Sequence, residues 1–152
     1  MGFTTPCFIR KQDTTELRNK LNKLGYFPHP TANPLYNNRN GELHTGRGFY
    51  ANLPIGYIEE IKNAIDCGTN EELFLAIAAL RDDKDEHQLF ISDSLLHIAF
   101  DDEIGNDHYF TYPSGVIFKW DYHWDNCTIK GEFHKMSVEE LINHFKFKIN
   151  QK

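Results

Sequence analysis

The sequence predicts an α+β fold in one domain, residues 1–152, with a mainly antiparallel sheet covered by three short capped helices. Two observations lead to this prediction. Three segments combine a short apolar stretch, a helix-capping residue and an amphipathic helix, and the segments between them are rich in strand-forming residues. A length of 152 residues with 40% hydrophobic and 25% charged residues suits a single folded domain.

The three helix segments share one local pattern. When they are aligned on Asp13, Thr69 and Ser137, each has a glutamate three residues later and apolar residues four and eight residues later. A capping side chain with glutamate three positions on forms a capping box, and apolar residues four apart share one helical face. Gly25 directly follows the first predicted helix, at the position where glycine commonly ends a helix. The pattern predicts helices over Thr14–Leu24, Asn70–Leu80 and Val138–Lys146, in β-α pseudo-repeats near 6–25, 63–81 and 131–147.

The insertion between the first two helices carries one clear strand, predicted over Gly48–Leu53. The segment Ile55–Asp66 fits two interpretations. Its apolar spacing suits a helix, whereas Ala64–Cys67 matches the short strand that precedes each of the other helices. Both interpretations stay open from the sequence.

The insertion before the third helix reads as β-structure throughout. Strands are expected over His87–Ile91 and Leu96–Phe100, separated by a short polar turn. A hairpin is expected to join His108–Tyr112 to Val116–Trp124, because Pro113-Ser114-Gly115 has the composition of a turn.

The last of these strands has two different faces. One face carries bulky apolar residues: Val116, Phe118, Trp120, Tyr122 and Trp124. We expect this face to lie in the core. The alternative is an exposed aromatic surface on which a ligand ring stacks. The other face carries Asp121 and His123, and His108 is expected on the facing strand. Aspartate and histidine are metal ligands, so these three residues are candidate ligands. We interpret them as a solvated polar face and assign no metal, no cofactor and no catalytic residue.

Charge and cysteine content limit the partners. The net charge is −6 and there is no basic cluster, so nucleic acid is not expected as a partner. No apolar run of 18 residues exists, so no membrane is expected either. Cys7, Cys67 and Cys127 are widely spaced and fit free thiols in a reducing compartment, which predicts a cytoplasmic protein.

The best candidate for anion binding is the stretch Asn37–Gly48. Its glycines allow close backbone approach, Arg39 and Arg47 can bind a phosphate, and His44 can donate a hydrogen bond. The stretch matches neither a P-loop nor a dinucleotide-binding motif. An ordinary polar hairpin loop is the alternative interpretation.

Three segments carry a resemblance to a known group of proteins: TPCFIRK-x-x-TTELRNKLNKLGY, CGTNEELFLAIAALRDDKD and HKMSVEELINHFK. They resemble a family of small proteins of unknown function from gut Bacteroidales genomes, their phages and mobile elements. The resemblance covers about a third of the chain. It implies a bacterial or phage cytoplasmic setting. It also implies that similar helical segments flank β-rich segments that vary between members, and it implies no activity.

These observations predict a soluble binding or interaction module, as in an accessory protein of a phage or mobile element. Its partner would be a protein or a small ligand, and its oligomeric state stays open. The contact surface is expected at Asn37–Gly48, Ser92–Asp107 and the face around Asp121–Asp125. One alternative is a protein that binds and sequesters a nucleotide-like signal through Arg39, His44 and Arg47. The other alternative is a metal-assisted hydrolase.

Overall fold

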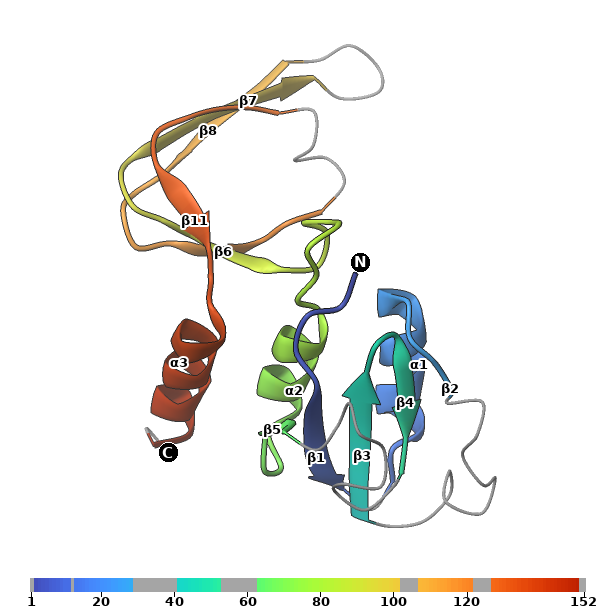
Figure 1. Cartoon of the computed structure of the whole chain (residues 1–152). Helices are drawn as coiled ribbons and strands as arrows, with labels where there is room; N and C mark the ends of the chain where they lie inside the picture. The colour runs from blue at the N-terminus through green and yellow to red at the C-terminus, as the bar shows by residue number, and fades with distance from the viewer. Residues whose placement is uncertain are drawn as a thin grey trace. The chain divides into compact units, whose positions relative to one another are not determined.

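The computed structural model describes residues 2–11, 13–28, 41–52, 63–101, 107–121 and 127–150. They form three helices, one mixed five-strand sheet and two antiparallel three-strand sheets (Figure 1). The α+β prediction is confirmed, but the strands belong to three sheets rather than to one. The chain divides into two compact units, residues 1–84 with 140–152, and residues 85–139. Among the described residues, no helix is long and apolar enough to span a membrane.

The first unit contains the five-strand sheet, in the order β2-β4-β3-β1-β5. The central pairs β1-β3 and β3-β4 are antiparallel, whereas β1-β5 and β2-β4 are parallel. The predicted strand after position 48 is confirmed as β4, and the end of the ambiguous segment forms β5. Residues 53–62 lie outside the described residues. The strands are β1 (Cys7–Lys11), β2 (Phe27–Pro28), β3 (Gly41–Gly46), β4 (Phe49–Ala51) and β5 (Ile65–Asp66).

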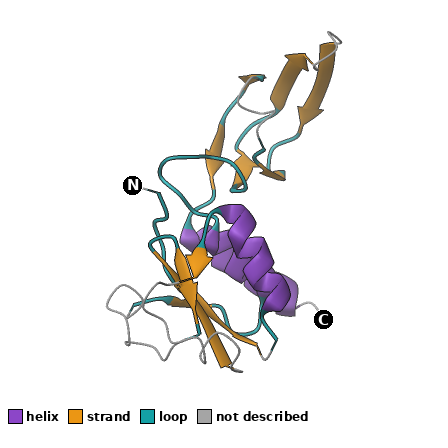
Figure 2. Cartoon of the chain, turned by 90° about the vertical axis from the view of Figure 1, so that its right-hand side faces the viewer, coloured by secondary structure: helices purple, strands orange, loops and turns teal. Residues whose placement is uncertain are grey.

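The helices are α1 (Thr15–Leu24), α2 (Glu71–Ala78) and α3 (Val138–Asn150), close to the predicted ranges. Figure 2 shows helices on one side of the five-strand sheet. Each helix follows a short strand, as expected: β1, β5 and β11 (Phe133–Lys135). However, β11 belongs to a different sheet from β1 and β5. The strand-then-helix order is therefore confirmed, whereas an internal repeat of the fold stays a prediction.

The predicted N-caps of the first two helices are wrong by one residue. Asn70, not Thr69, caps α2, and its Oδ1 accepts a hydrogen bond from the Leu73 N–H at 3.1 Å. The reason is a turn at Gly68, whose N–H donates to the Asp66 carboxylate at 2.8 Å. This turn occupies Thr69 and delays the helix by one residue.

The first helix starts and ends in different ways. Its N-cap is Thr14, which makes no side-chain capping bond, while the Asp13 carboxylate accepts from the Thr15 N–H at 3.0 Å. The end is as predicted. Gly25 has φ 113°, and its N–H donates to the carbonyls of Leu21 and Asn22. A left-handed residue that closes the last turn in this way favours glycine.

The core of the first unit lies between this sheet and the helices. The Cys7 side chain in β1 points at α2, where its thiol lies 3.6 Å from the Phe74 carbonyl oxygen. The Tyr26 hydroxyl donates to the Ala78 carbonyl at 2.8 Å, and burial raises the pKa of this phenol. The neighbouring Cys7 thiol and burial together raise the pKa of Cys67. Apolar side chains complete the core, among them Ile9, Leu17, Leu21, Leu43 and Ile77.

The second unit contains six strands in two sheets, ordered β10-β7-β8 and β11-β6-β9. The pairs β6-β7, β8-β9 and β10-β11 are consecutive in the chain, and each passes from one sheet to the other through a short corner. The unit is therefore three long antiparallel strands, each bent once. The strands other than β11 are β6 (Leu89–Ser92), β7 (Leu96–Asp101), β8 (Asp107–Tyr112), β9 (Ile117–Lys119) and β10 (Thr128–Lys130).

The predicted hairpin across Pro113-Ser114-Gly115 is wrong. β8 pairs with β7, whereas β9 pairs with β6 in the other sheet. The chain bends here because Ser92 holds both sides of the corner. Its hydroxyl donates to the Pro113 carbonyl at 2.6 Å and accepts from the Val116 N–H at 2.9 Å. The amino-acid composition of a turn does not distinguish a hairpin, in which the chain reverses direction, from a corner at which a strand bends into a second sheet.

The core of this unit lies between its two sheets. Phe118 and Trp120 are buried, at 6% and 8% exposure, which confirms that part of the predicted aromatic face. The strand ends earlier than expected, at Lys119, and Tyr122 and Trp124 lie outside the described residues. The Trp120 ring packs on Phe90 with centroids 4.8 Å apart. Other members of the cluster are Leu96, Ile98, Phe110, Tyr112, Cys127, Ile129 and Phe133.

Candidate functional site

The two described residues of the predicted anion site, His44 and Arg47, differ in exposure. His44 lies in β3, is 1% exposed, and stacks on the Phe8 ring with centroids 5.1 Å apart. Arg47 is exposed in the turn between β3 and β4, with φ 49°. Arg39 lies outside the described residues. Because His44 is buried, Arg47 is exposed and Arg39 is not described, the structure brings no two of them together at one surface, and anion binding by the three stays a prediction.

Of the candidate metal ligands, the two that the structure describes come from different sheets. His108 belongs to β8 and stacks on the Phe100 ring with centroids 4.8 Å apart. Asp121 follows β9, which lies in the other sheet, and it is exposed. His123 lies outside the described residues. Within the part of the chain that the structure describes, no three His, Cys, Asp or Glu side chains cluster as metal ligands.

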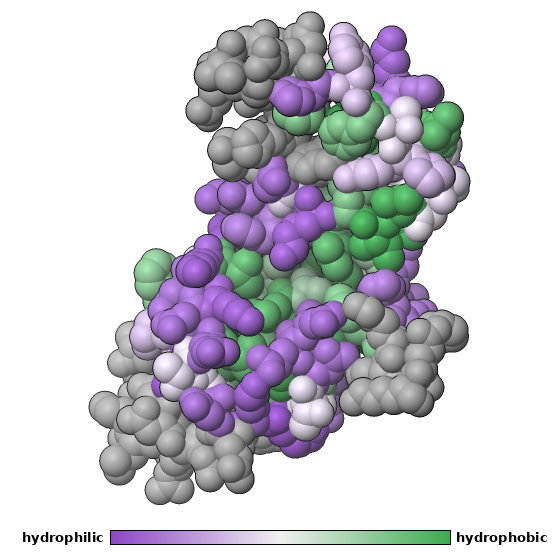
Figure 3. Space-filling view, turned by 180° about the vertical axis from the view of Figure 1, so that it is seen from behind, coloured by the Kyte–Doolittle hydropathy of each residue, from purple (hydrophilic) through white to green (hydrophobic). Residues whose placement is uncertain are grey.

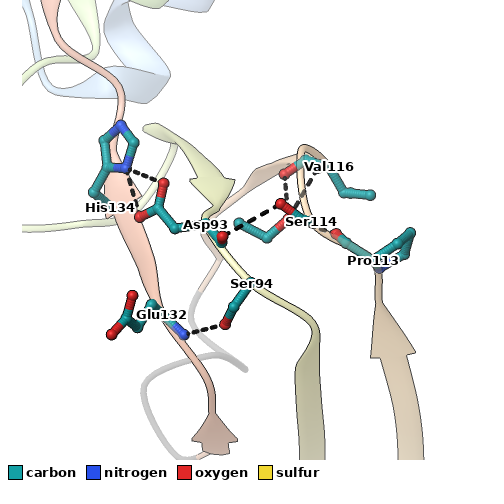
Figure 4. A network of polar contacts seen from close by, with 8 residues as sticks. Asp93, Ser94, Pro113, Ser114, Val116, Glu132 and His134 are labelled. Carbon is teal, nitrogen blue, oxygen red and sulfur yellow. Dashed lines mark hydrogen bonds and ion pairs between the residues drawn. The ribbon is translucent and has the colours of Figure 1, made fainter.

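A polar network joins the three strand corners of the second unit (Figure 4). The imidazole Nδ1 of His134 lies 2.8 Å from the nearer oxygen of the Asp93 carboxylate. The Ser94 hydroxyl accepts from the Glu132 N–H at 2.8 Å, and the Ser114 hydroxyl donates to the Asp93 carbonyl at 3.3 Å. The corner at Asp93 and Ser94 is therefore bonded to both of the other corners, through Ser114 and through Glu132.

The chemistry of this network is structural. A histidine oriented by a carboxylate resembles part of a catalytic triad, which also needs a nucleophile at the imidazole. In Figure 4 the Ser94 and Ser114 hydroxyls point to backbone atoms rather than to the His134 ring. We therefore assign no nucleophile to this His–Asp pair.

Apolar surface is scattered over the described chain. Figure 3 shows hydrophobic side chains among hydrophilic ones on the face that it displays. The large hydrophobic residues most exposed in the described part are Phe27, Leu95 and Tyr109, at 64%, 52% and 78%. They come from β2, the corner before β7, and β8. Of these, Tyr109 lines a hollow.

This hollow lies on the outer face of the sheet β10-β7-β8 and has a volume of about 470 Å³. Two rows of side chains cross the three strands on that face. In one row, Lys130 faces His97, which faces Thr111; in the other, Thr128 faces Ala99, which faces Tyr109. Neighbouring side chains in a row lie about 5 Å apart, and the rows are about 7 Å apart. Ala99 is the smallest of the six, so the hollow opens above it.

The hollow has a rigid floor. The residues that alternate with the two rows, such as Ile98, point to the opposite face and belong to the core cluster or pack against it. Close packing beneath a sheet holds the strands in place. The outer face therefore presents its side chains from a fixed framework.

Three polar side chains around the hollow have no partner in the part of the chain that the structure describes. Within the described residues, the side chains of His97, Tyr109 and Lys130 make no hydrogen bond, ion pair or ring contact. The other described histidines all contact a neighbour: His44 on Phe8, His87 near Glu86, His108 on Phe100, His134 with Asp93, and His144 on Phe145. The hollow thus collects donors that have no partner among the described residues.

Sequence reasoning missed this site as a unit. The segment around His97 and Ala99 falls in the predicted contact surface Ser92–Asp107, but the sequence does not join Tyr109, Thr111 and Lys130 to it. A partial signal is present, because polar or small residues alternate with large apolar ones along β7 and β10. What the alternation does not reveal is which strands pair.

Comparisons of this chain with protein-family models, with curated proteins and with solved structures find no match. Function is therefore inferred from the residues and geometry of the hollow.

Proposed function

We propose that this protein is a binding module that holds a small ligand in the hollow on the outer face of β10-β7-β8. The observation that carries the proposal is the hollow itself, about 470 Å³ in volume, around which the side chains of His97, Tyr109 and Lys130 make no polar or ring contact with other described residues. Small-molecule sites in proteins have volumes of about 300–1,000 Å³ and a few polar groups that converge on the ligand.

The hollow favours a small ligand over a protein partner. Surfaces that bind proteins bury about 800 Å² on each side and centre on a cluster of aromatic or apolar anchors. Here Tyr109 is the one large aromatic side chain among the described residues that rises from this face. A role as an accessory protein of a mobile element stays a prediction from the sequence resemblance.

A thermal-shift screen tests the proposal. The whole chain is screened against nucleotides, amino acids, monosaccharides and divalent metals. A ligand at a hundredfold its Kd stabilises the folded state by about 2.7 kcal/mol, which raises Tm by several degrees. We expect at least one class of compound to produce this shift.

A variant that fills the hollow localises the site. Ala99→Phe places a ring in the hollow and should abolish the shift, while Leu95→Phe adds a ring at an exposed position outside the hollow and should keep it. Melting curves without ligand check that both variants fold. A flat screen, or a shift that survives Ala99→Phe, would refute the proposal.

A further inference from the structure

We infer that the hollow takes a phosphorylated small molecule with a planar ring, such as a nucleoside monophosphate, with its phosphate on Lys130 and His97 and its ring against Tyr109. The inference rests on the proposed function, because it names the ligand class of the same hollow. It differs from the sequence prediction, which put a phosphate on Arg39, His44 and Arg47.

The donors of one row fit a phosphate. Lys130, His97 and Thr111 stand side by side on three neighbouring strands. The ammonium of Lys130 has three donors, and the imidazole and hydroxyl add one each. A phosphate presents three terminal oxygens that accept such bonds, whereas a carboxylate presents two. Three donors that stand side by side on three strands therefore match a phosphate better than a carboxylate.

The charges around the hollow point the same way. No aspartate or glutamate is among the described residues that line it, and Lys130 supplies a positive charge. The segment 85–139 has many carboxylates, no arginine, and three lysines. Of these, Lys135 pairs with Asp85 at 3.1 Å, and Lys119 lies on the other sheet. Lys130 is the lysine of this unit that faces the hollow.

The second row supplies a place for a ring. Tyr109 is 78% exposed, although aromatic side chains usually gain free energy from burial. Ala99 beside it leaves space at the height of the tyrosine ring, and Thr128 closes the far side. A planar base that lies over Ala99 and against Tyr109 would remain about 7 Å from the phosphate row, one step along the strands.

The net negative charge of the chain opposes an anionic ligand, but carboxylates far from the bound phosphate oppose it only weakly. At physiological ionic strength, charges farther than about 8 Å from the phosphate are largely screened. The register places Asp101 opposite Asp107 at the end of the sheet away from Lys130. The row of donors lies at the other end, next to the strand corners.

Calorimetric titration of the whole chain at physiological ionic strength tests the inference, with adenosine 5′-monophosphate as the probe. Adenosine, inorganic phosphate and benzoate are the comparison ligands. We expect adenosine 5′-monophosphate to bind at least tenfold more tightly than any of the three, because adenosine and benzoate lack the phosphate and inorganic phosphate lacks the ring. Equal affinity for adenosine would overturn the phosphate assignment, and equal affinity for benzoate would replace it by a carboxylate.

Two variants separate the two contacts. Lys130→Gln should weaken binding of adenosine 5′-monophosphate about tenfold, as loss of a charge-assisted hydrogen bond does, while the control Lys119→Gln leaves it unchanged. Tyr109→Leu should weaken it about fivefold through loss of stacking, without affecting inorganic phosphate. Equal effects of the two lysine variants would overturn the inference.

The outcomes also separate this inference from the proposed function. If another compound binds and Ala99→Phe abolishes its binding, while adenosine 5′-monophosphate does not bind, the phosphate inference fails and the binding module stands. If Ala99→Phe weakens the binding of no compound, both the phosphate inference and the proposed binding module fail.

Discussion

Gly131, at the corner between β10 and β11, gives the most direct test of the bent-strand architecture. Its φ is 126°, in a region that L side chains rarely adopt. A Cβ at this position would lie 2.6 Å from the Leu95 carbonyl oxygen and 2.8 Å from Leu96 Cδ2. Because the closest atom belongs to the backbone of the neighbouring corner, the contact is relieved only if that corner shifts.

The expected cost of Gly131→Ala has two parts. An alanine held at positive φ costs about 1–2 kcal/mol. The overlap with the Leu95 carbonyl adds about 1–3 kcal/mol, as overpacking usually does. The free energy of unfolding should therefore fall by about 2–5 kcal/mol.

A matched control isolates the overlap. Gly115 also has positive φ, 87°, but a Cβ there meets nothing within 4 Å in the described chain. Gly115→Ala should cost about 1–2 kcal/mol, and both variants lower the entropy of the unfolded chain equally. Urea unfolding followed by tryptophan fluorescence suits this comparison, since both tryptophans lie in residues 85–139. If Gly131→Ala costs no more than Gly115→Ala, the close approach of the corners is wrong.

Three further predictions concern other parts of the chain. Asn70→Ala should lower the free energy of unfolding by about 1 kcal/mol and Thr69→Ala by much less, because Asn70 is the residue that caps α2; equal losses in urea unfolding would argue against this. Ser92→Ala should cost about 1–3 kcal/mol by the same assay, because it leaves a backbone N–H at the corner without its partner, and a cost near zero would contradict the corner's bonding. The hydrogen bond from Arg81 lowers the pKa of Asp83 from 3.8 to about 2, so its stabilising effect is complete above pH 4 and is lost as the pH falls toward 2. Asp83→Asn should therefore lower the urea midpoint at pH 6 and have little effect at pH 2; an equal effect at both pH values would refute the pairing.

The local structure could be predicted from the sequence to the extent that short-range interactions decide it. Apolar spacing located all three helices, and Gly25 marked the end of α1, because helices depend on residues three and four apart. The N-cap error at Thr69 has a local cause as well. The turn that the Asp66 carboxylate stabilises competes with the capping pattern, and the pattern alone does not rank the two.

Strand pairing could not be predicted in the same way. Pro113-Ser114-Gly115 has a composition that suits a hairpin, yet Ser92, more than 20 residues earlier, turns it into a bend between two sheets. The candidate site depends on this pairing. His97 and Lys130 lie 33 positions apart and become neighbours through the antiparallel register of β7 and β10. Alternation predicts which face a side chain takes but not which strand lies beside it.

The measurement that tests the binding site most directly is a two-dimensional amide NMR titration of the whole chain with adenosine 5′-monophosphate. The account predicts shift changes at the six residues of the two rows, centred on Ala99 and Lys130, with little change in β3 and its turn at Arg47. Changes centred on Arg47, or no changes at any residue of the hollow, would contradict it.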